Sequence, residues 1–274
     1  AIAAIGMGSG IGILIALPYT HLLIEWLGWQ TSLLVLSATA LLILPLAYPL
    51  SGTPAAPAKT GAQQNVRQAL AEAFRHPSFW LLNAGFFVCG FHVVFYGTHL
   101  PAYVADQGLG NEVAVSALML VGLGNLAGTW IAGQWGTKGS KRLGLSAIYL
   151  GRALVFLGFL FLPISAATVL LLSAALGLLW LSTIPLTSGL VATFFGPRWM
   201  TMLYGIVFFS HQVGSFLGVW LGGYLFDRLK SYDAMWWISV ALGVFAALVH
   251  LPIREKPVQR IEVDGEAGAV KTAG

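Results

Sequence analysis

The sequence has 274 residues, of which 57% are hydrophobic and only 9% are charged, and its mean hydropathy is +0.80. Soluble domains carry about 25% charged residues, so this composition excludes an ordinary soluble enzyme, a disordered chain and a nucleic-acid-binding protein. The single cysteine, Cys89, excludes an intrachain disulfide and a cysteine-based zinc site. The six histidines are too scattered to indicate any other metal site, and no cofactor is expected. The sequence therefore predicts a membrane protein.

Apolar stretches long enough to cross a bilayer recur along the whole chain. A hydrocarbon core of about 30 Å needs about 20 apolar residues in a helix. Prolines and glycines within such stretches are tolerated when neighbouring helices satisfy the freed backbone groups. We therefore predict an all-α membrane protein with eight transmembrane helices, at residues 1–21, 31–50, 78–104, 113–136, 144–163, 167–195, 200–226 and 234–253.

One long polar stretch, residues 51–77, separates the first two predicted spans from the other six. Its first part is rich in Pro, Ala and Gly, which is typical of a linker. Residues 66–74 have the spacing of a short amphipathic helix that lies in the membrane interface. At the N-terminus there is no methionine and no signal-peptide pattern. We therefore expect the chain to begin within a longer protein.

The basic residues predict an orientation, because Lys and Arg concentrate in cytoplasmic loops. Eleven of the 14 lie in alternate loops or in the tail from residue 254, and the other loops contain only Arg228 and Lys230. Arg152 lies inside a predicted span. We therefore expect a cytoplasmic C-terminus. The eleven residues are Lys59, Arg67, Arg75, Lys138, Lys141, Arg142, Arg198, Arg254, Lys256, Arg260 and Lys271.

The last six predicted spans contain an internal repeat. Residues 124–138 align with residues 214–228 at a constant offset of 90 residues, with Gly, Gly, Trp and Gly at matching positions. The two segments are the second spans of consecutive three-span groups. Triplets of spans insert with opposite orientations, which is the inverted-repeat plan of many secondary transporters. Glycines four residues apart also suit close helix packing, so a shared small-residue spacing remains an alternative explanation.

With this pattern, the chain resembles the major facilitator superfamily. The stretch 132–142 (AGQWGTKGSKR) is similar to the family's loop motif, although Thr137 replaces the family's Asp and Ser140 replaces a Gly. The stretches 98–109 (THLPAYVADQGL) and 211–227 (HQVGSFLGVWLGGYLFD) resemble a bacterial branch similar to monocarboxylate porters and oxalate–formate antiporters. The matching residues of the loop motif are Gly133, Gly136, Lys138, Lys141 and Arg142.

The resemblance implies a domain organisation. Residues 1–50 would be the last two helices of the family's N-terminal bundle, and residues 51–77 its central cytoplasmic loop. Residues 78–253 would be the C-terminal six-helix bundle with its 3+3 inverted repeat, and residues 254–274 a cytoplasmic tail. On this mapping the chain contains helices 5 to 12, so the family's first four helices are missing and are an expected partner of this part.

The family architecture also implies that the first two helices of each triplet face the transport cavity. Polar side chains near the middle of these helices are candidates for binding substrate, because polar groups in hydrocarbon need a partner or water. Plain hydrogen bonding between helices is the alternative. The candidates are His92, Asn125, Thr183, His211 and Gln212.

Arg152 is the one permanent charge well inside a predicted span. Its guanidinium could bind a substrate carboxylate, as would suit a monocarboxylate transporter. Its helix, however, is the third of a triplet, which the family places at the periphery. The alternative is an arginine that reaches the cytoplasmic surface or bonds to backbone carbonyls.

Prolines interrupt the first helices of both triplets, which is the sequence pattern of a transport site. Pro101 and Pro185 are therefore candidate hinge residues, with a simple packing kink as the alternative. His99 lies near the outer end of its helix and is a candidate gate residue. Histidine titrates near neutral pH, but the predicted spans contain no Asp or Glu for a proton relay.

These observations predict a secondary active transporter, not an enzyme, that moves a small organic solute by alternating access. The branch that the chain resembles makes a monocarboxylate the candidate solute, and the bacterial cytoplasmic membrane the expected location. The expected partners are this solute, the lipid bilayer and the missing helices, with no nucleic acid. A drug or metabolite exporter of the same fold and a non-transporting membrane sensor or scaffold are the alternatives.

Overall fold

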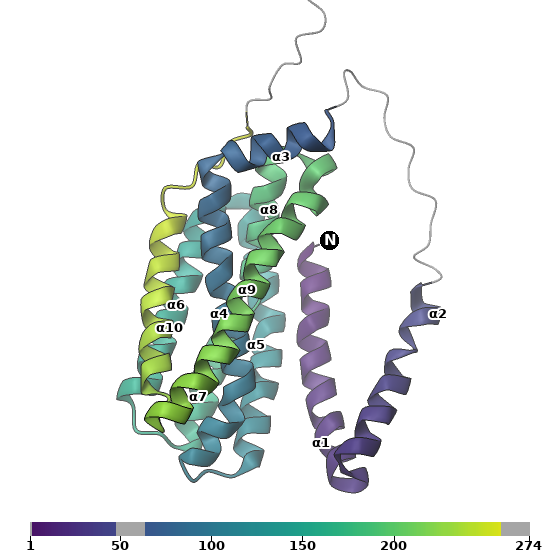
Figure 1. Ribbon diagram of the computed structural model, residues 1–274, viewed down its shortest axis with the longest axis vertical. Helices are drawn as coiled ribbons and strands as arrows, with labels where there is room; N and C mark the ends of the chain where they lie inside the picture. Colours follow the sequence, from purple (N-terminus) through teal and green to yellow (C-terminus); the bar gives the residue numbers. More distant parts are fainter. Residues whose placement is uncertain (1, 48–63, 259–274) are drawn as a thin grey trace, which may run out of the picture.

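The computed structural model describes residues 2–47 and 64–258, and the regular structure in these residues is helical (Figure 1). Seven helical stretches there are long and apolar enough to cross a membrane, the first being Gly10–Pro45. The predicted all-α membrane fold is confirmed. The helices are α1 (Ile2–Ala40), α2 (Ile43–Ala47), α3 (Val66–Arg75), α4 (Pro77–Asp106), α5 (Asn111–Lys138), α6 (Lys141–Phe161), α7 (Ala166–Leu179), α8 (Thr183–Phe195), α9 (Pro197–Leu229) and α10 (Asp233–His250).

The first two predicted spans form a hairpin whose turn is much shorter than the loop expected at residues 22–30. Gly28 alone leaves the helical conformation within α1, with φ 73° and ψ 164°, and the chain reverses direction there (Figure 1). A positive φ is readily adopted by glycine because it has no Cβ. One glycine thus replaces a loop, and the residues on either side of it remain helical.

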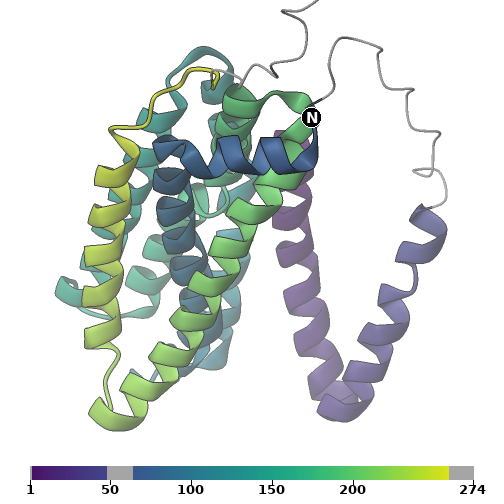
Figure 2. The ribbon, with the colours of Figure 1, turned by 45° about the horizontal axis from the view of Figure 1, so that its top comes forward.

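Helices α4 to α10 form a bundle, and the hairpin of α1 stands beside it (Figure 1). The first arm of α1 packs against α5, where Gly10 and Gly122 allow the two backbones to approach closely. Helix α3 lies across one end of the bundle, as Figure 2 shows. We call this the α3 end.

Helix α3 begins and ends close to the predicted bounds of residues 66–74. The Asn65 side chain accepts a hydrogen bond from the backbone N–H of Gln68, and the Gln68 side chain accepts one from the backbone N–H of Asn65, which is a complete capping box. Its location in a membrane interface stays a prediction. The linker predicted in the first part of residues 51–77 lies outside the described residues, up to residue 63.

The two triplets pack against each other in a reciprocal way. Helix α9 of the second triplet packs on α4, the first helix of the first triplet, and α5 packs on α7 in the same manner. A Cβ on Gly214 would meet the backbone of Phe87, whereas one on Gly124 would meet the backbone of Gly177. Gly214 lies 90 residues after Gly124, and Gly177 lies 90 residues after Phe87. The two contacts are therefore related by the offset of the internal repeat.

The span predicted at residues 167–195 consists of two helices, α7 and α8, separated at residues 180–182, which we call the α7–α8 break. Pro185 has no N–H to donate to Leu181, and a proline ring clashes with the carbonyl four residues before it. The Leu181 carbonyl accepts from Ile184 N instead. In contrast, α4 continues through Pro101. The interruption expected there is therefore absent, and only the second triplet has a broken first helix among the described residues.

Candidate functional site

Arg152 on α6 is fully buried, and its guanidinium lies at the α7–α8 break. Its Nε and Nη2 groups donate to the Leu179 carbonyl at 3.1 and 2.7 Å, and Nη2 also donates to the Trp180 carbonyl. These carbonyls lose their helical partners where α7 ends. The guanidinium also lies over the Tyr149 ring, 5.3 Å from its centroid. These contacts match the alternative stated from the sequence, in which Arg152 bonds to backbone carbonyls.

Asn125 on α5 binds the same break from another helix. Its side-chain oxygen accepts hydrogen bonds from the backbone N–H of Leu181 and from Thr129 Oγ1, both at 3.0 Å. Asn125 and Arg152 thus satisfy a donor and two acceptors that the α7–α8 break exposes inside the bundle. A break in hydrocarbon needs such partners, because no water is available to hydrogen-bond the backbone.

Cys89 on α4 joins these residues to Thr183 and His211. Its Sγ lies 3.3 Å from Thr183 Oγ1 and 3.7 Å from Arg152 Nη2. The His211 side chain lies near enough to the thiol to interact with it electrostatically. Five residues from five helices therefore converge on the break, and we call them the break cluster: Cys89, Asn125, Arg152, Thr183 and His211.

Sequence reasoning missed Cys89. One buried cysteine in an apolar helix carries no pattern that distinguishes it from a packing residue. Its role becomes visible only when α4, α6 and α8 are placed around it.

His211 and Gln212 are neighbours in sequence but differ in exposure. His211 is only 7% exposed and its ring stacks on Phe208, with centroids 5.2 Å apart. Gln212 is exposed, and its side-chain oxygen lies 3.2 Å from His211 Nδ1. Gln212 therefore contacts the break cluster only through His211.

His92 on α4 has its contacts away from the break. Its Nε2 lies 2.9 Å from the Ser239 carbonyl on α10, and its ring meets Phe156 edge-on. Of the six candidate substrate-binding residues, four belong to the break cluster, whereas Gln212 borders it and His92 connects α4 to α10.

Several donors in this region are buried and have no hydrogen-bond partner among the described residues. They include Arg152 Nη1 and Asn125 Nδ2. No ion pair of Arg152 with an acidic side chain is found in the described part of the chain, where the recorded ion pair is that of His21 and Glu25. Guanidinium and amide N–H groups are suitable donors for carboxylate oxygens.

The candidate gate residue His99 lies toward the opposite end of the bundle. Its Nε2 is 3.0 Å from the Val219 carbonyl of α9, and its Nδ1 is 3.3 Å from the Tyr232 hydroxyl, just before α10. His99 therefore connects α4 to the α9–α10 connection, close to Pro101. Pro185, the second candidate hinge, lies in the first turn of α8 directly after the break.

The loop motif lies at the α3 end, where it contacts the segment after α10. Arg142 Nη1 donates to the Leu251 carbonyl at 2.6 Å. The Glu255 carboxylate accepts from Ser140 Oγ and from the backbone N–H groups of Lys141 and Arg142. Partial burial raises the pKa of Glu255, but these hydrogen bonds and the Lys141 charge outweigh burial, so that the pKa is lowered overall. No sequence pattern indicates that Glu255 caps α6.

The remaining residues of the loop motif, Gly133, Gly136 and Lys138, lie on the last turns of α5. A Cβ on Gly136 would be 3.0 Å from Leu186 of α8, so this glycine allows α5 and α8 to approach. Lys138 is exposed.

Comparison with known proteins identifies relatives that match most of the chain. Monocarboxylate transporter 11 of Homo sapiens is 26% identical over 91% of this chain and 56% of its own length. The MFS-type transporter YcxA of Bacillus subtilis (strain 168) is 26% identical over 93% of this chain and 64% of its own length. The MFS-type transporter YhjX of Escherichia coli (strain K12) is 25% identical over 78% of this chain and 54% of its own length. The chain thus spans less than two thirds of these relatives' lengths.

The family model described as Major Facilitator Superfamily matches residues 1–219, which is most of the chain. This match and the relatives confirm the resemblance to monocarboxylate transporters and their bacterial relatives that the motifs indicated. Together with the apolar helices of the bundle, they lead to one conclusion: the chain is an integral membrane protein that belongs to the major facilitator superfamily of transporters.

Proposed function

We propose that this chain is part of a secondary active transporter that moves a small organic anion, with a monocarboxylate as the preferred candidate, by alternating access. The observation that carries the proposal is the reciprocal packing of the two triplets around the α7–α8 break. Transport sites in inverted-repeat folds lie near the bilayer midplane at discontinuous helices, where freed backbone groups and polar side chains meet.

The preference for an anion rests on the charge of the break cluster. Arg152 brings a permanent positive charge into the bundle, and no acidic side chain forms an ion pair with it in the described residues. Its Nη1 group and Asn125 Nδ2 have no hydrogen-bond partner there. A carboxylate that reached these donors would gain charge-assisted hydrogen bonds away from water. The names of the relatives, which include monocarboxylate transporters, point the same way.

The orientation follows from the basic residues. We infer that the α3 end faces the cytoplasm, because eight described Lys and Arg side chains lie there and only Arg228 and Lys230 lie at the opposite end. The bacterial relatives support the cytoplasmic membrane of a bacterium as the location. The eight residues are Arg67, Arg75, Lys138, Lys141, Arg142, Arg198, Arg254 and Lys256.

Uptake by proteoliposomes tests the proposal. The full-length transporter that contains this chain would be reconstituted and supplied with radiolabelled lactate, pyruvate or acetate, alongside an uncharged solute of similar size. We expect saturable uptake of a monocarboxylate, and His211→Ala should lower it at least tenfold, because the His211 side chain lies near Cys89 at the break. Phe209→Ala is the matched control, since Phe209 lies on the same helix but is 69% exposed.

The outcomes separate the candidate functions. Normal uptake by a correctly inserted His211→Ala protein would remove this residue from the site. Flux of apolar drugs without flux of monocarboxylates would favour an exporter of the same fold. If no solute crosses the membrane although the protein is inserted, the transport proposal is wrong and a sensor or scaffold is favoured.

A further inference from the structure

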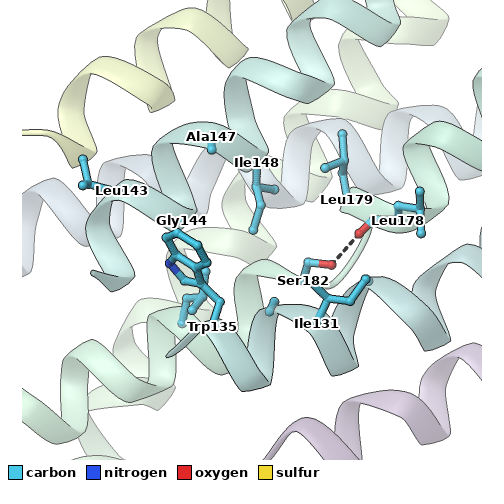
Figure 3. Close-up of a pocket in the computed structure, with 12 residues that line it drawn as sticks. Ile131, Trp135, Leu143, Gly144, Ala147, Ile148, Leu178, Leu179 and Ser182 are labelled. Carbon is cyan, nitrogen blue, oxygen red and sulfur yellow. Dashed lines mark hydrogen bonds between the residues drawn. The ribbon is translucent and has the colours of Figure 1, made fainter. Parts of the chain in front are cut away.

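An apolar groove opens on the side of the bundle between α5, α6 and the α7–α8 region (Figure 3). Its volume is about 310 Å³, which is at the lower bound of the usual ligand pockets. Its lining is almost wholly apolar and includes Ile131, Trp135, Leu143, Ala147 and Leu179.

The lining of the groove does not suit a polar solute. Its one side-chain hydroxyl, on Ser182, already donates to the Leu178 carbonyl at 2.6 Å, and Figure 3 shows this hydrogen bond beside the groove. Several lining side chains are also turned outward: Ile131 is 56% exposed and Leu143 is 47% exposed. In a membrane-spanning bundle, such a surface faces the hydrocarbon of the bilayer. The groove is thus separate from the break cluster in chemistry, although Leu179 borders both.

A positive charge, that of Lys138, lies one helical turn beyond the groove residue Trp135 on α5. Ile131, Trp135 and Lys138 follow each other at intervals of four and three residues, so they share one face of α5. Lys138 is the last residue of that helix and is exposed. The indole of Trp135 donates to the Ser140 carbonyl at 2.9 Å, and an amphipathic ring at this depth is typical of the headgroup region.

Among the described residues, Lys138 forms no ion pair with a carboxylate. Glu255 accepts hydrogen bonds from Ser140 and from the backbone of Lys141 and Arg142, and the lining of the groove contains no acidic residue. An apolar groove with a cation near one end is complementary to a molecule with a hydrocarbon chain and an anionic head.

We propose that this groove binds an anionic phospholipid, with one acyl chain between Ile131, Ala147 and Leu179 and with the phosphate at Lys138. The acyl chain would lie against the last turn of α7, next to the carbonyls that Arg152 binds. The site needs only the membrane-embedded bundle, so it stands whether or not the transported solute is a monocarboxylate.

Native mass spectrometry of the purified protein tests the proposal. The detergent-solubilised protein would be mixed with equal amounts of phosphatidylglycerol and phosphatidylcholine of the same acyl chains. We expect at least threefold more bound phosphatidylglycerol. Lys138→Gln should remove this preference, whereas Arg67→Gln, which removes an exposed charge from α3, should keep it.

A second pair of variants tests the groove itself. Ala147 is exposed and lines the groove, so Ala147→Phe should fill it and lower the binding of both lipids at least threefold. Ala241→Phe is the control on the exposed side of α10. Gel filtration confirms that each variant remains folded.

Three results would overturn the proposal. They are equal binding of the two lipids to the unaltered protein, an unchanged preference in Lys138→Gln, and undiminished binding in a folded Ala147→Phe protein. Inorganic phosphate at millimolar concentration serves as the soluble probe. If it displaces phosphatidylglycerol completely, Lys138 is a simple anion site and the acyl chain contributes nothing.

Discussion

Arg152 shows how a permanent charge is tolerated inside this bundle. A charged side chain in a membrane is costly unless it is paired or bonded to backbone carbonyls. Here the helix break supplies the carbonyls of Leu179 and Trp180, and the arginine supplies the donors that these carbonyls lack. The buried arginine and the helix break thus stabilise each other. A replacement of Arg152 should therefore change the structure of the break before it changes the binding of any solute.

Replacement of Arg152 measures this mutual support. Arg152→Leu leaves two buried carbonyls without donors, and each such loss costs about 1–3 kcal/mol. We expect a loss of about 2–6 kcal/mol in the free energy of unfolding in detergent. Arg152→Lys should lose about half as much, because an ammonium cannot reproduce the planar fork of the guanidinium.

Thermal and SDS-induced unfolding provide the measurement, with Arg67→Gln as the control for removing a positive charge at an exposed position. Equal stability of Arg152→Leu and the unaltered protein would show that the break needs no side-chain donors.

The partners of these residues could not be predicted from the sequence. Polar residues in the middle of apolar spans were recognisable as candidates, and four of six do converge on one place. Which atoms they meet depends on where the helix breaks and on how the helices rotate about their axes. The Leu181 N–H donates to Asn125 because the helix is interrupted at residues 180–182, just before Pro185.

At the scale of helices, glycines determine how closely the two triplets approach. Gly214 and Gly218 place α9 directly against the backbone of α4, and Gly218 has no room for a Cβ because the Phe91 carbonyl would be 2.6 Å away. Small residues at such interfaces allow dispersion contacts between backbones, which drive association in membranes. The spacing of these glycines was visible in the sequence, and it is confirmed as a packing surface.

A pair of glycine replacements on α9 tests this packing. Gly214→Ala would bring a methyl group into the Phe87 carbonyl, whereas Gly205→Ala meets open space. Overpacking costs about 1–3 kcal/mol, so Gly214→Ala should lower the free energy of unfolding by that amount. Gly205→Ala should leave it unchanged or raise it slightly, because alanine favours the helix.

The unfolding midpoint in detergent distinguishes the two variants. If both shift it equally, the effect comes from the helix itself and not from the contact between α9 and α4.

Helix ends were harder to predict than helix positions. Eight spans were predicted from length and hydropathy, whereas the described residues contain seven candidate spans, because the first two predicted spans are joined in Gly10–Pro45. The turn at Gly28 was not predicted, because a single glycine can reverse the chain direction without a loop. The continuity of α4 through Pro101 was not predicted either, because neighbouring helices can satisfy the backbone groups that a proline frees. In contrast, Pro185 follows Ser182 and Thr183, which begin helices readily, and the helix does break there.

For the molecule as a whole, the distribution of charge predicts which end faces the cytoplasm. Lys256 lies at the α3 end, and Gln107 lies beyond the opposite end of α4; both are exposed. Lys256→Cys should therefore react with a membrane-impermeant maleimide only after right-side-out cells are permeabilised. Gln107→Cys should react without permeabilisation. Native Cys89 is fully buried, so the unaltered protein provides the background.

Labelling of Lys256→Cys in intact cells, with Gln107→Cys protected, would reverse the assigned orientation. Even then, Lys256 and Gln107 would still lie at opposite ends of the bundle.

The contacts of Glu255 have a consequence for the order in which the protein can be completed during synthesis. The carboxylate caps α6 through Ser140, 115 residues earlier in the chain, and Val258 N donates to the Phe194 carbonyl at the end of α8. The ribosome synthesises α6 and α8 before it reaches Glu255 and Val258. The start of α6 and the end of α8 therefore lack these hydrogen bonds until α10 has been inserted and the segment that follows it has been synthesised.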